Sequence, residues 1–155
     1  MVRFAKEKDI ERVNELRKQV NDIHVEGRPD IFKPGFGTEI RDVAERFIQE
    51  ENKDIIVAIR DDEICGMLCV EVVNKPESPY SKARSYYNVV EVAVDEKHRH
   101  QGIGRELFEF IKTDAARRGL DKIELDVWEF NESAIEFYKA VGFKETRRWF
   151  EFDVK

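Results

Sequence analysis

Apolar and polar residues follow a helical spacing in two stretches of the first third of the chain. The first stretch begins near Lys8-Asp9, and the second carries an apolar stripe made of Ile40, Val43, Ala44, Phe47 and Ile48. Apolar residues repeating every three or four positions predict amphipathic helices. Two prolines and two glycines within residues 24–35 predict a loop between them, because proline interrupts helical hydrogen bonding. A short strand at about residues 2–5 comes first.

The remaining residues alternate between predicted strands and helices. Residues 55–59 and 64–70 flank a polar turn and predict a β-hairpin. A strand over residues 89–94 precedes a helix whose apolar face ends at Gly119. We then expect a strand over residues 123–127, a short helix at about 131–140, and a final strand from Phe143 to about Phe152. The predicted order is β-α-α-β-β-β-α-β-α-β around one mostly antiparallel sheet, which is an α+β fold.

Length, charge and cysteine spacing narrow the class of protein. The 155 residues, 41% of them hydrophobic, suffice for one core and predict a single domain over residues 1–155. A net charge of −6, with acidic and basic residues interleaved, argues against a nucleic-acid partner. The absence of a long apolar run or a leader pattern predicts a cytoplasmic protein without a membrane partner. Cys65 and Cys69 lie four residues apart in a predicted strand, too far for a disulfide, and are expected to be reduced packing residues.

The junction after the strand at residues 89–94 carries a candidate anion site. Gly102-Ile103-Gly104 opens the following helix, where main-chain N–H groups lack helical partners. Glycines let a phosphate approach these groups, and the positive helix end favours it. Taken alone, the two glycines favour a tight turn without a ligand over an anion site. A P-loop would need a Gly-Lys-Ser/Thr sequence and a Rossmann site would need a third glycine, and neither is present.

Two segments of the sequence resemble motifs of the GNAT superfamily of N-acetyltransferases. Val92-Ala93-Val94-Asp95, followed by Arg99-x-x-Gly102-x-Gly104, resembles its acetyl-CoA signature. Residues 131–143 resemble its Asn-x-x-Ala-x-x-x-Tyr-x-x-x-Gly-Phe segment, at the right distance downstream. The resemblance implies the GNAT fold, a mixed, mostly antiparallel sheet of six to seven strands with about four helices. The first 85 residues match in their pattern of elements alone.

The resemblance also implies that acetyl-CoA is the cosubstrate. Amides from His100 to Arg105 would hold the pyrophosphate, and the strand edge near Val92 and Val94 would pair with the pantetheine arm and supply an oxyanion donor. Asn131 would contact the pantetheine or the opening that admits it, and as an N-cap it fits the following helix equally well. The implied cofactor-binding residues are Val92, Ala93, Val94, Arg99, His100, Gln101, Gly102, Ile103, Gly104, Arg105, Asn131 and Tyr138.

Three side chains are candidates for the proton transfers of this reaction. Tyr138 occupies the position at which the superfamily places a general acid for the departing thiolate, although its helical spacing also fits a core aromatic. Glu91 and Asp126 interrupt apolar strands, as a catalytic base or an ion-paired residue would. We rank Glu91 above Asp126, and a base role for water remains an alternative.

The loop between the first two helices would line the acceptor side of the site. His24, Arg28, Asp30 and Phe32 come from this region, with Trp128 and Tyr86 nearby. The three histidines, His24, His98 and His100, show no metal-ligand spacing, so no metal is expected.

The predicted function is transfer of the acetyl group of acetyl-CoA to a primary amine, of a small molecule or a peptide, by direct attack in a ternary complex. A non-catalytic module that binds or senses acyl-CoA is the alternative. A general phosphate- or nucleotide-binding protein is a third reading. Trp149, Phe150 and Phe152 in the final predicted strand could present an apolar edge for a homodimer, or form an ordinary core strand.

Overall fold

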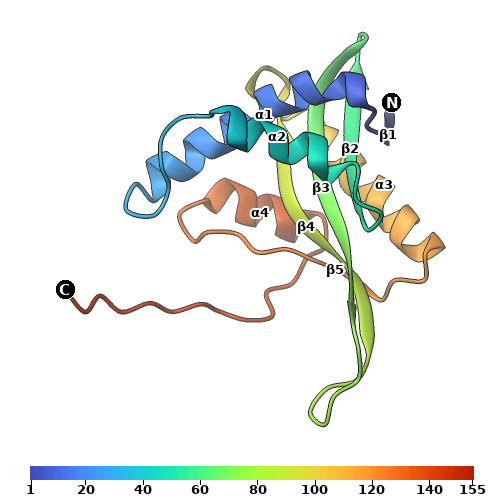
Figure 1. Cartoon of the computed structure of the whole chain (residues 1–155), viewed down its shortest axis with the longest axis vertical. Helices are drawn as coiled ribbons and strands as arrows, with labels where there is room; N and C mark the ends of the chain where they lie inside the picture. The colour runs from blue at the N-terminus through green and yellow to red at the C-terminus, as the bar shows by residue number, and fades with distance from the viewer.

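A five-stranded sheet forms the centre of the computed structural model, which describes residues 1–155 (Figure 1). The strands lie in the order β1-β2-β3-β4-β5, with antiparallel pairing from β1 to β4 and parallel pairing between β4 and β5. The strands span β1 Val2–Phe4, β2 Lys53–Arg60, β3 Glu63–Lys75, β4 Arg84–Val94 and β5 Lys122–Glu124. The helices span α1 Ile10–Gly27, α2 Thr38–Phe47, α3 Ile103–Arg117 and α4 Glu132–Ala140. Short 3-10 turns at Glu7–Asp9 and Glu96–His98 precede α1 and follow β4.

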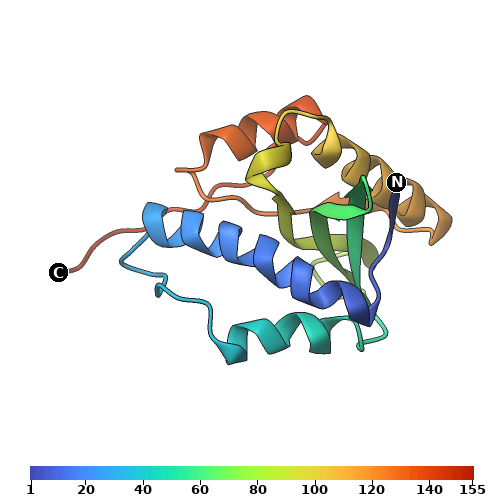
Figure 2. The same cartoon turned by 90° about the horizontal axis from the view of Figure 1, so that it is seen from above.

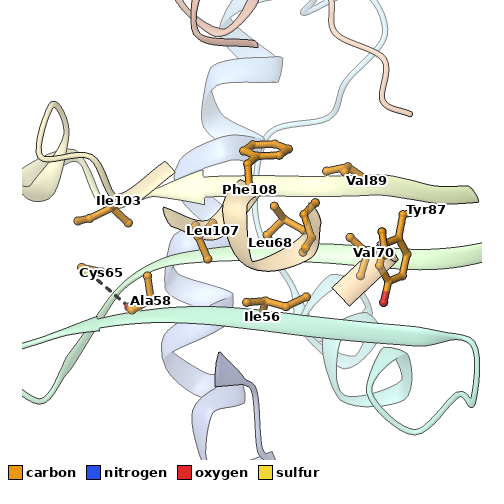
Figure 3. Packing of buried hydrophobic residues seen from close by; sticks show 12 residues of the cluster. Ile56, Ala58, Cys65, Leu68, Val70, Tyr87, Val89, Ile103, Leu107 and Phe108 are labelled. Atoms are coloured by element: carbon orange, nitrogen blue, oxygen red, sulfur yellow. Dashed lines mark hydrogen bonds between the residues drawn. The ribbon is translucent and has the colours of Figure 1, made fainter. Parts of the chain in front are cut away.

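Helices cover both faces of the sheet, so the central strands are apolar on both sides. Figure 2 shows α1 and α2 on one face and α3 and α4 on the other. Ile55 and Val57 of β2 pack on the side of α1 and α2, whereas Ile56 and Ala58 pack on the side of α3. This alternation follows from the two-residue period of a strand. The larger of the two cores surrounds Phe108 of α3 (Figure 3).

The hairpin of β2 and β3 contains the two cysteines, both free and buried as expected. The Cys65 thiol donates a hydrogen bond to the Ala58 carbonyl oxygen at 3.3 Å, which Figure 3 shows on the α3 face. Cys69 belongs to the opposite core, with α1 and α2. They are packing residues.

The predicted order of elements is confirmed except at its end. Residues 143–152 form no strand, so the prediction of a sixth strand is wrong for the isolated chain. Residues 144–155, which we call the tail, extend away from the sheet with no strand beside them (Figure 1). β5 is also shorter than the predicted 123–127, because only Lys122–Glu124 have partners in β4. The sheet therefore has five strands where six to seven were expected.

Two other boundaries shift for physical reasons. α1 continues through Gly27, so His24 lies on a helix and not in the predicted loop. The helix ends at Arg28, whose backbone leaves the helical region because Pro29 follows it. β4 begins at Arg84, before the predicted start at residue 89, as the strand-forming pair Tyr86 and Tyr87 extends it. None of the helices combines the length and the apolar character that crossing a bilayer requires.

Candidate active site

The edge of β4 that faces β5 is open over half its length. Only Tyr86, Tyr87 and Asn88 pair with β5, so residues 89–94 have no strand on that side. A bulge at Val90 contributes to this divergence, since Val89 opposes Val70 and Glu91 opposes Cys69 in β3. A bulge bends its strand and increases the local twist. The sheet therefore splays between β4 and β5.

Strand geometry fixes which groups of this edge are free. The Asp95 N–H donates to the Cys65 carbonyl oxygen in β3 at 2.8 Å. Because antiparallel residues alternate in direction, Val92 and Val94 direct their N–H and C=O groups away from β3, and Ala93 directs its own toward it. The groups of Val92 and Val94 lie along the open edge. They are suited to pair with an extended amide-containing ligand.

The turn after β4 is held by α1. We call residues Asp95–Arg105 the cofactor turn. Asp95 is buried and accepts hydrogen bonds from Arg12, from Gln19 at 3.3 Å and from the Lys97 N–H at 3.2 Å. Burial alone would raise the pKa of Asp95, but these hydrogen bonds outweigh it and hold the pKa below its usual range. The Gln19 side-chain oxygen also accepts from the Glu96 N–H at 3.2 Å, so two residues of α1 position the turn.

A run of free main-chain amides follows. No N–H group from Arg99 to Arg105 donates a hydrogen bond to another group of the chain. His100 and Gly102 both have left-handed backbones, with φ of 63° and 80°, which bring the chain sharply into α3. Arg99 and Arg105 are exposed and form no ion pair. Free amides at a helix start, flanked by unpaired arginines, form a site for a phosphate or pyrophosphate.

Gly104 allows α4 to approach this turn closely. A Cβ atom at position 104 would lie 2.8 Å from the Phe137 Cζ atom, closer than any normal contact. Gly102 needs its glycine for the positive φ, because nothing surrounds it. The two glycines of the motif therefore have different roles, one in packing and one in backbone conformation. Ile103 between them is buried in the core, so only its N–H group faces the site.

Tyr138 of α4 lies against the aromatic core beside the turn. Its ring packs at 5.9 Å from Phe108 and at 5.9 Å from Phe143. Burial, with a contribution from the charge of Asp126, raises the pKa of Tyr138 to about 12. The phenol therefore keeps its proton at every physiological pH.

Asn131 forms the N-cap of α4. Its side-chain oxygen accepts from the Ala134 N–H at 3.3 Å and from the Ser133 hydroxyl at 3.4 Å. The capping interpretation is thus confirmed, and contact with a cofactor stays a prediction. His98, beside the turn, has a buried Nδ1 atom with no hydrogen-bond partner, 3.7 Å from Asp95.

The two candidate bases lie on different sides of the open edge. Glu91 points to the face covered by α1, where the Arg17 Nε atom donates to it at 2.8 Å. Arg17 is buried and also donates to Asn14 and to the Ile40 carbonyl oxygen. Asp126 is exposed, beyond the end of β5, and its charge acts on Tyr138. An ion pair was one of the two expected readings of Glu91.

An aromatic cluster lies beyond Glu91, and we call it the acceptor cluster: His24, Phe32, Trp128 and Phe130. The His24 and Phe32 rings stack at 5.2 Å, and Phe32 meets Trp128 edge-on at 5.7 Å. Phe130 lies 6.4 Å from both His24 and Trp128. Burial lowers the pKa of His24, and the charge of Glu91 opposes this only in part. His24 is therefore neutral near neutral pH.

A guanidinium occupies one face of this cluster. The Arg28 guanidinium carbon lies 5.0 Å from the centre of the Trp128 ring, a cation–π geometry. Asp30 and Glu151 of the tail both pair with Arg28 at 2.8 Å. The structure thus brings together the five predicted acceptor residues. Tyr86 lies apart from them, buried and stacked with Arg84 at 4.3 Å.

Three residues of the site were not predicted. Arg17 follows Val13 by four residues and lies on the apolar stripe of α1, a position at which a charged residue signals a buried ion pair. Phe130 and Glu151 carry no such signal, because their roles depend on contacts across 100 residues or more of sequence. No group of three or more His, Cys, Asp or Glu side chains in the structure could hold a metal ion.

Comparison with known proteins assigns the chain to a family. The family model described as "Acetyltransferase (GNAT) family" matches residues 17–143. The chain belongs to the acetyltransferase (GNAT) family. This confirms the resemblance seen in the two motifs and the predicted fold, and the predicted enzyme class, an acetyltransferase domain, follows from it.

Individual relatives agree with this assignment. N-acetyltransferase 8 of Homo sapiens is 26% identical over 113 residues, which are 73% of this chain and 48% of that protein. The chain spans about half the length of the curated relatives that it matches first. The X-ray structure of a tetramutant of the BH1408 protein from Bacillus halodurans is 31% identical and covers 99% of both chains, with a TM-score of 0.95. The aminoglycoside N-acetyltransferase AAC(6')-Iy in complex with CoA shares the fold, with a TM-score of 0.74, 16% identity, and coverage of 100% of this chain and 99% of that one.

Proposed function

We propose that this chain transfers the acetyl group of acetyl-CoA to a primary amine by direct attack in a ternary complex. The observation that carries the proposal is the run of undonated amides from Arg99 to Arg105, directly beside the open edge of β4. These two features match the two ends of an acyl-CoA, an anionic pyrophosphate and an extended amide-containing arm. The GNAT-fold neighbour AAC(6')-Iy was solved in complex with CoA, which is consistent with this fit.

The chain's own groups suffice for the proposed chemistry. The amine nitrogen attacks the thioester carbonyl carbon, a C–N bond forms and the C–S bond breaks. A free N–H of Val92 or Val94 would hydrogen-bond the oxyanion, and one such donor typically contributes about 100-fold or more to the rate. The protonated Tyr138 phenol would give its proton to the departing thiolate. Amide and free CoA thiol are the products.

The amine must lose a proton, and Glu91 is the preferred acceptor. Its carboxylate pairs with Arg17 of α1, the helix that also carries His24 of the acceptor cluster, and its charge acts on His24. Asp126 lies beside Tyr138, where a thiolate would leave, so it is less well placed to receive a proton from the incoming amine. A water held by Glu91 fulfils the same role, since Arg17 binds only one of the two carboxylate oxygens.

The acceptor is a cationic amine in this proposal. His24, Phe32 and Trp128 offer aromatic faces, and a ring face attracts a cation held within about 6 Å of it. The Arg28 guanidinium lies over Trp128 in this geometry, which supports the proposal that the cluster attracts cations. The net charge of −6 would also raise the local concentration of a cationic substrate. A small-molecule amine and a peptide N-terminus both fit this description.

A non-catalytic acyl-CoA-binding module is the second candidate function. The cofactor turn and the open edge would serve it equally well. Tyr138 distinguishes the two, because a pure binding protein has no use for a proton donor with a pKa of about 12 beside the thiol.

Release of thiol measured with acetyl-CoA and a panel of amines tests the proposal. The panel contains polyamines, aminoglycosides, amino acids and peptides with free N-termini. We expect amine-dependent thiol release with at least one class and calorimetric binding of acetyl-CoA. Binding of acetyl-CoA without thiol release for any amine of the panel would favour the non-catalytic acyl-CoA-binding function. Absence of both binding and release would overturn the assignment of acetyl-CoA as cosubstrate. Displacement of acetyl-CoA by ATP would instead support a general nucleotide site.

Four further points belong to the proposal. Residues 1–155 act as a single N-acetyltransferase domain. The protein works in the cytoplasm, and neither a nucleic acid nor a membrane is its partner. It forms a homodimer.

A further inference from the structure

Arg28 presents two hydrogen-bonding edges to carboxylates beside the acceptor cluster. Its Nε and Nη2 atoms donate to the two carboxylate oxygens of Asp30 at 2.9 and 2.8 Å. On the adjacent edge, Nη1 lies 2.8 Å from the Glu151 Oε1 atom, and Nη2 donates to Oε2 at 3.2 Å. Both contacts are bidentate, the arrangement in which a planar guanidinium recognises a carboxylate most specifically. Arg28 therefore holds two carboxylates at once.

The two carboxylates are held to Arg28 in different ways. Asp30 belongs to the turn that ends α1, in which the N–H groups of Ile31 and Phe32 donate to the Arg28 carbonyl oxygen at 3.0 Å. Glu151 belongs to the tail, whose backbone forms no hydrogen bond within the chain. The Glu151 side chain is 62% exposed, against 21% for Arg28. An exposed ion pair is weak, so another carboxylate can replace Glu151, whereas Asp30 stays in place.

The edge of Arg28 that Glu151 occupies lies at the acceptor cluster. The guanidinium carbon is 5.0 Å from the centre of the Trp128 ring, and Phe32 connects that ring to His24. The cluster thus combines ring faces, which attract a cation, with a fixed guanidinium, which attracts an anion. A molecule that carries both charges is complementary to this arrangement.

We propose that Arg28 binds a carboxylate of the acceptor, in the place that Glu151 occupies, and that the acceptor is an amino acid. This inference rests on the proposed acetyl transfer and names the class of its acceptor. The rings of His24 and Phe32 attract the ammonium end, and Arg28 fixes the carboxylate end. Glu151 pairs with the guanidinium when no acceptor is bound.

A diamine is the competing class of acceptor, because two carboxylates lie here and the chain has a net charge of −6. All four carboxylate oxygens of Asp30 and Glu151 already pair with Arg28. A second ammonium group would find no unpaired oxygen there, and it would be repelled by the guanidinium. The site therefore favours a carboxylate over a second ammonium group.

The spacing along α1 indicates how far apart the two ends of the acceptor lie. Glu91, the preferred group to receive the amine proton, pairs with Arg17. Arg28 follows Arg17 by eleven residues, which corresponds to roughly 16 Å along the helix axis. An amine near Glu91 and a carboxylate on Arg28 are best joined by a chain of several carbon atoms. The terminal amine of free lysine fits this spacing better than the α-amine of alanine.

Matched pairs of amines that differ only in the carboxylate test the proposal. The pairs are lysine and cadaverine, 6-aminohexanoate and pentylamine, and alanine and ethylamine. We expect kcat/KM to be about tenfold or more higher for the acid in at least one of the two longer pairs, since a bidentate charged contact is gained. No preference for the acid in any pair would overturn this inference and leave the proposed acetyl transfer standing.

Arg28→Gln and Lys33→Gln separate carboxylate binding from overall charge. Lys33 is exposed in the same loop and forms no ion pair. We expect Arg28→Gln to raise KM for the preferred acid about ten- to hundredfold and to leave KM for the matching amine unchanged. Lys33→Gln removes the same charge and should keep the preference for the acid. A preference for the acid that survives in Arg28→Gln would overturn the proposal.

Glu151→Gln removes the carboxylate that competes with the acceptor. We expect KM for the preferred acid to fall about two- to fivefold, because the exposed ion pair no longer has to be broken. KM for the matching amine should stay the same. Asp153→Asn changes an exposed, unpaired acid of the tail and should alter neither value. An unchanged or higher KM for the acid in Glu151→Gln would refute the exchange of Glu151 for the acceptor.

Calorimetry separates this inference from the proposed function, because it does not depend on turnover. In the presence of CoA, we expect lysine or 6-aminohexanoate to bind to the chain and neither to bind to Arg28→Gln. Such binding without any acetylation would support the carboxylate site and count against acetyl transfer. No binding of either acid, together with acetylation of the simple amines, would refute the carboxylate site and support acetyl transfer.

Discussion

The cofactor turn and the acceptor cluster are built in opposite ways. The cofactor turn is one continuous segment, Asp95–Arg105, and from Arg99 onward it offers main-chain N–H groups that donate to no other group of the chain. The acceptor cluster takes its side chains from the end of α1, from the loop after it, and from the segment between β5 and α4. One is a property of local backbone, the other of long-range packing.

Because of this difference, substitutions should affect the two regions unequally. Main-chain donors do not depend on side-chain identity, so the turn tolerates change except at its glycines and at Asp95. The acceptor cluster consists only of side chains, so single substitutions alter its shape. Cofactor binding and acceptor choice should therefore respond to different mutations, and the following experiments test this separation.

The largest effect is expected at Tyr138, the proposed proton donor to the departing thiolate. Tyr138→Phe removes the proton donor and keeps the ring that packs on Phe108. We expect kcat to fall by about 100-fold or more, the usual contribution of a general acid. Affinity for acetyl-CoA, measured by calorimetry, should stay unchanged. Equal losses of affinity and turnover would indicate that Tyr138 acts through packing.

A valine at position 104 should disturb the cofactor turn and leave the acceptor cluster intact. Gly104→Val forces atoms against Phe137, where even a Cβ would lie at 2.8 Å, and pushes α3 and α4 apart. Overpacking of this kind costs about 1–3 kcal/mol of stability. We expect that loss in denaturant unfolding, with weaker binding of acetyl-CoA.

Gly37→Val provides the matched control for Gly104→Val. Nothing lies within 4 Å of a Cβ at Gly37, and its φ of −81° suits any residue. Gly37 is also the N-cap of α2, where glycine is preferred over valine, so we expect a smaller loss of stability there and unchanged affinity for acetyl-CoA. A loss at Gly37 as large as that at Gly104 would contradict the packing explanation.

Truncation of Phe32 should weaken binding of the acceptor amine and leave binding of acetyl-CoA unchanged. Phe32→Ala removes the ring that joins His24 to Trp128. Each aromatic contact contributes about 0.5–1.5 kcal/mol, so we expect KM for the amine to rise roughly tenfold. Ile31→Ala, at the exposed neighbouring position, should change little. A rise in KM for acetyl-CoA of the same size would show that the two regions are not separate.

The smallest effect concerns the pH dependence of stability through His24. Its pKa is lowered by burial, so below about pH 6.5 the unfolded chain binds a proton that the folded chain resists. His24 therefore makes the free energy of unfolding decrease as the pH falls from about 6.5 toward the lowered pKa. Denaturant unfolding across this range should show a weaker pH dependence for His24→Gln. Identical slopes for both proteins would argue that His24 is not buried.

The sequence was sufficient to predict the local features of the fold and the cofactor turn. Apolar periodicity identified all four helices, and the Gly102-x-Gly104 spacing located the free amides, because both depend on residues close together in the chain. Phe130 and Glu151 were missed since their neighbours are set by packing. The final strand was predicted wrongly, because an alternating pattern does not specify whether a partner strand is available to it.

α1 connects the two regions whose construction differs. Arg12 and Gln19 hold Asp95 and Glu96 of the cofactor turn, and His24 stands five residues further along the same helix. At 1.5 Å per residue, the distance along the helix axis from Gln19 to His24 is about 7.5 Å. A phosphate held by the cofactor turn and an amine held at the acceptor cluster would therefore be separated by a fixed length of helix. Evolution of a new acceptor preference on this scaffold would proceed by exchanging rings around His24, while the depth at which the amine meets the thioester stays the same.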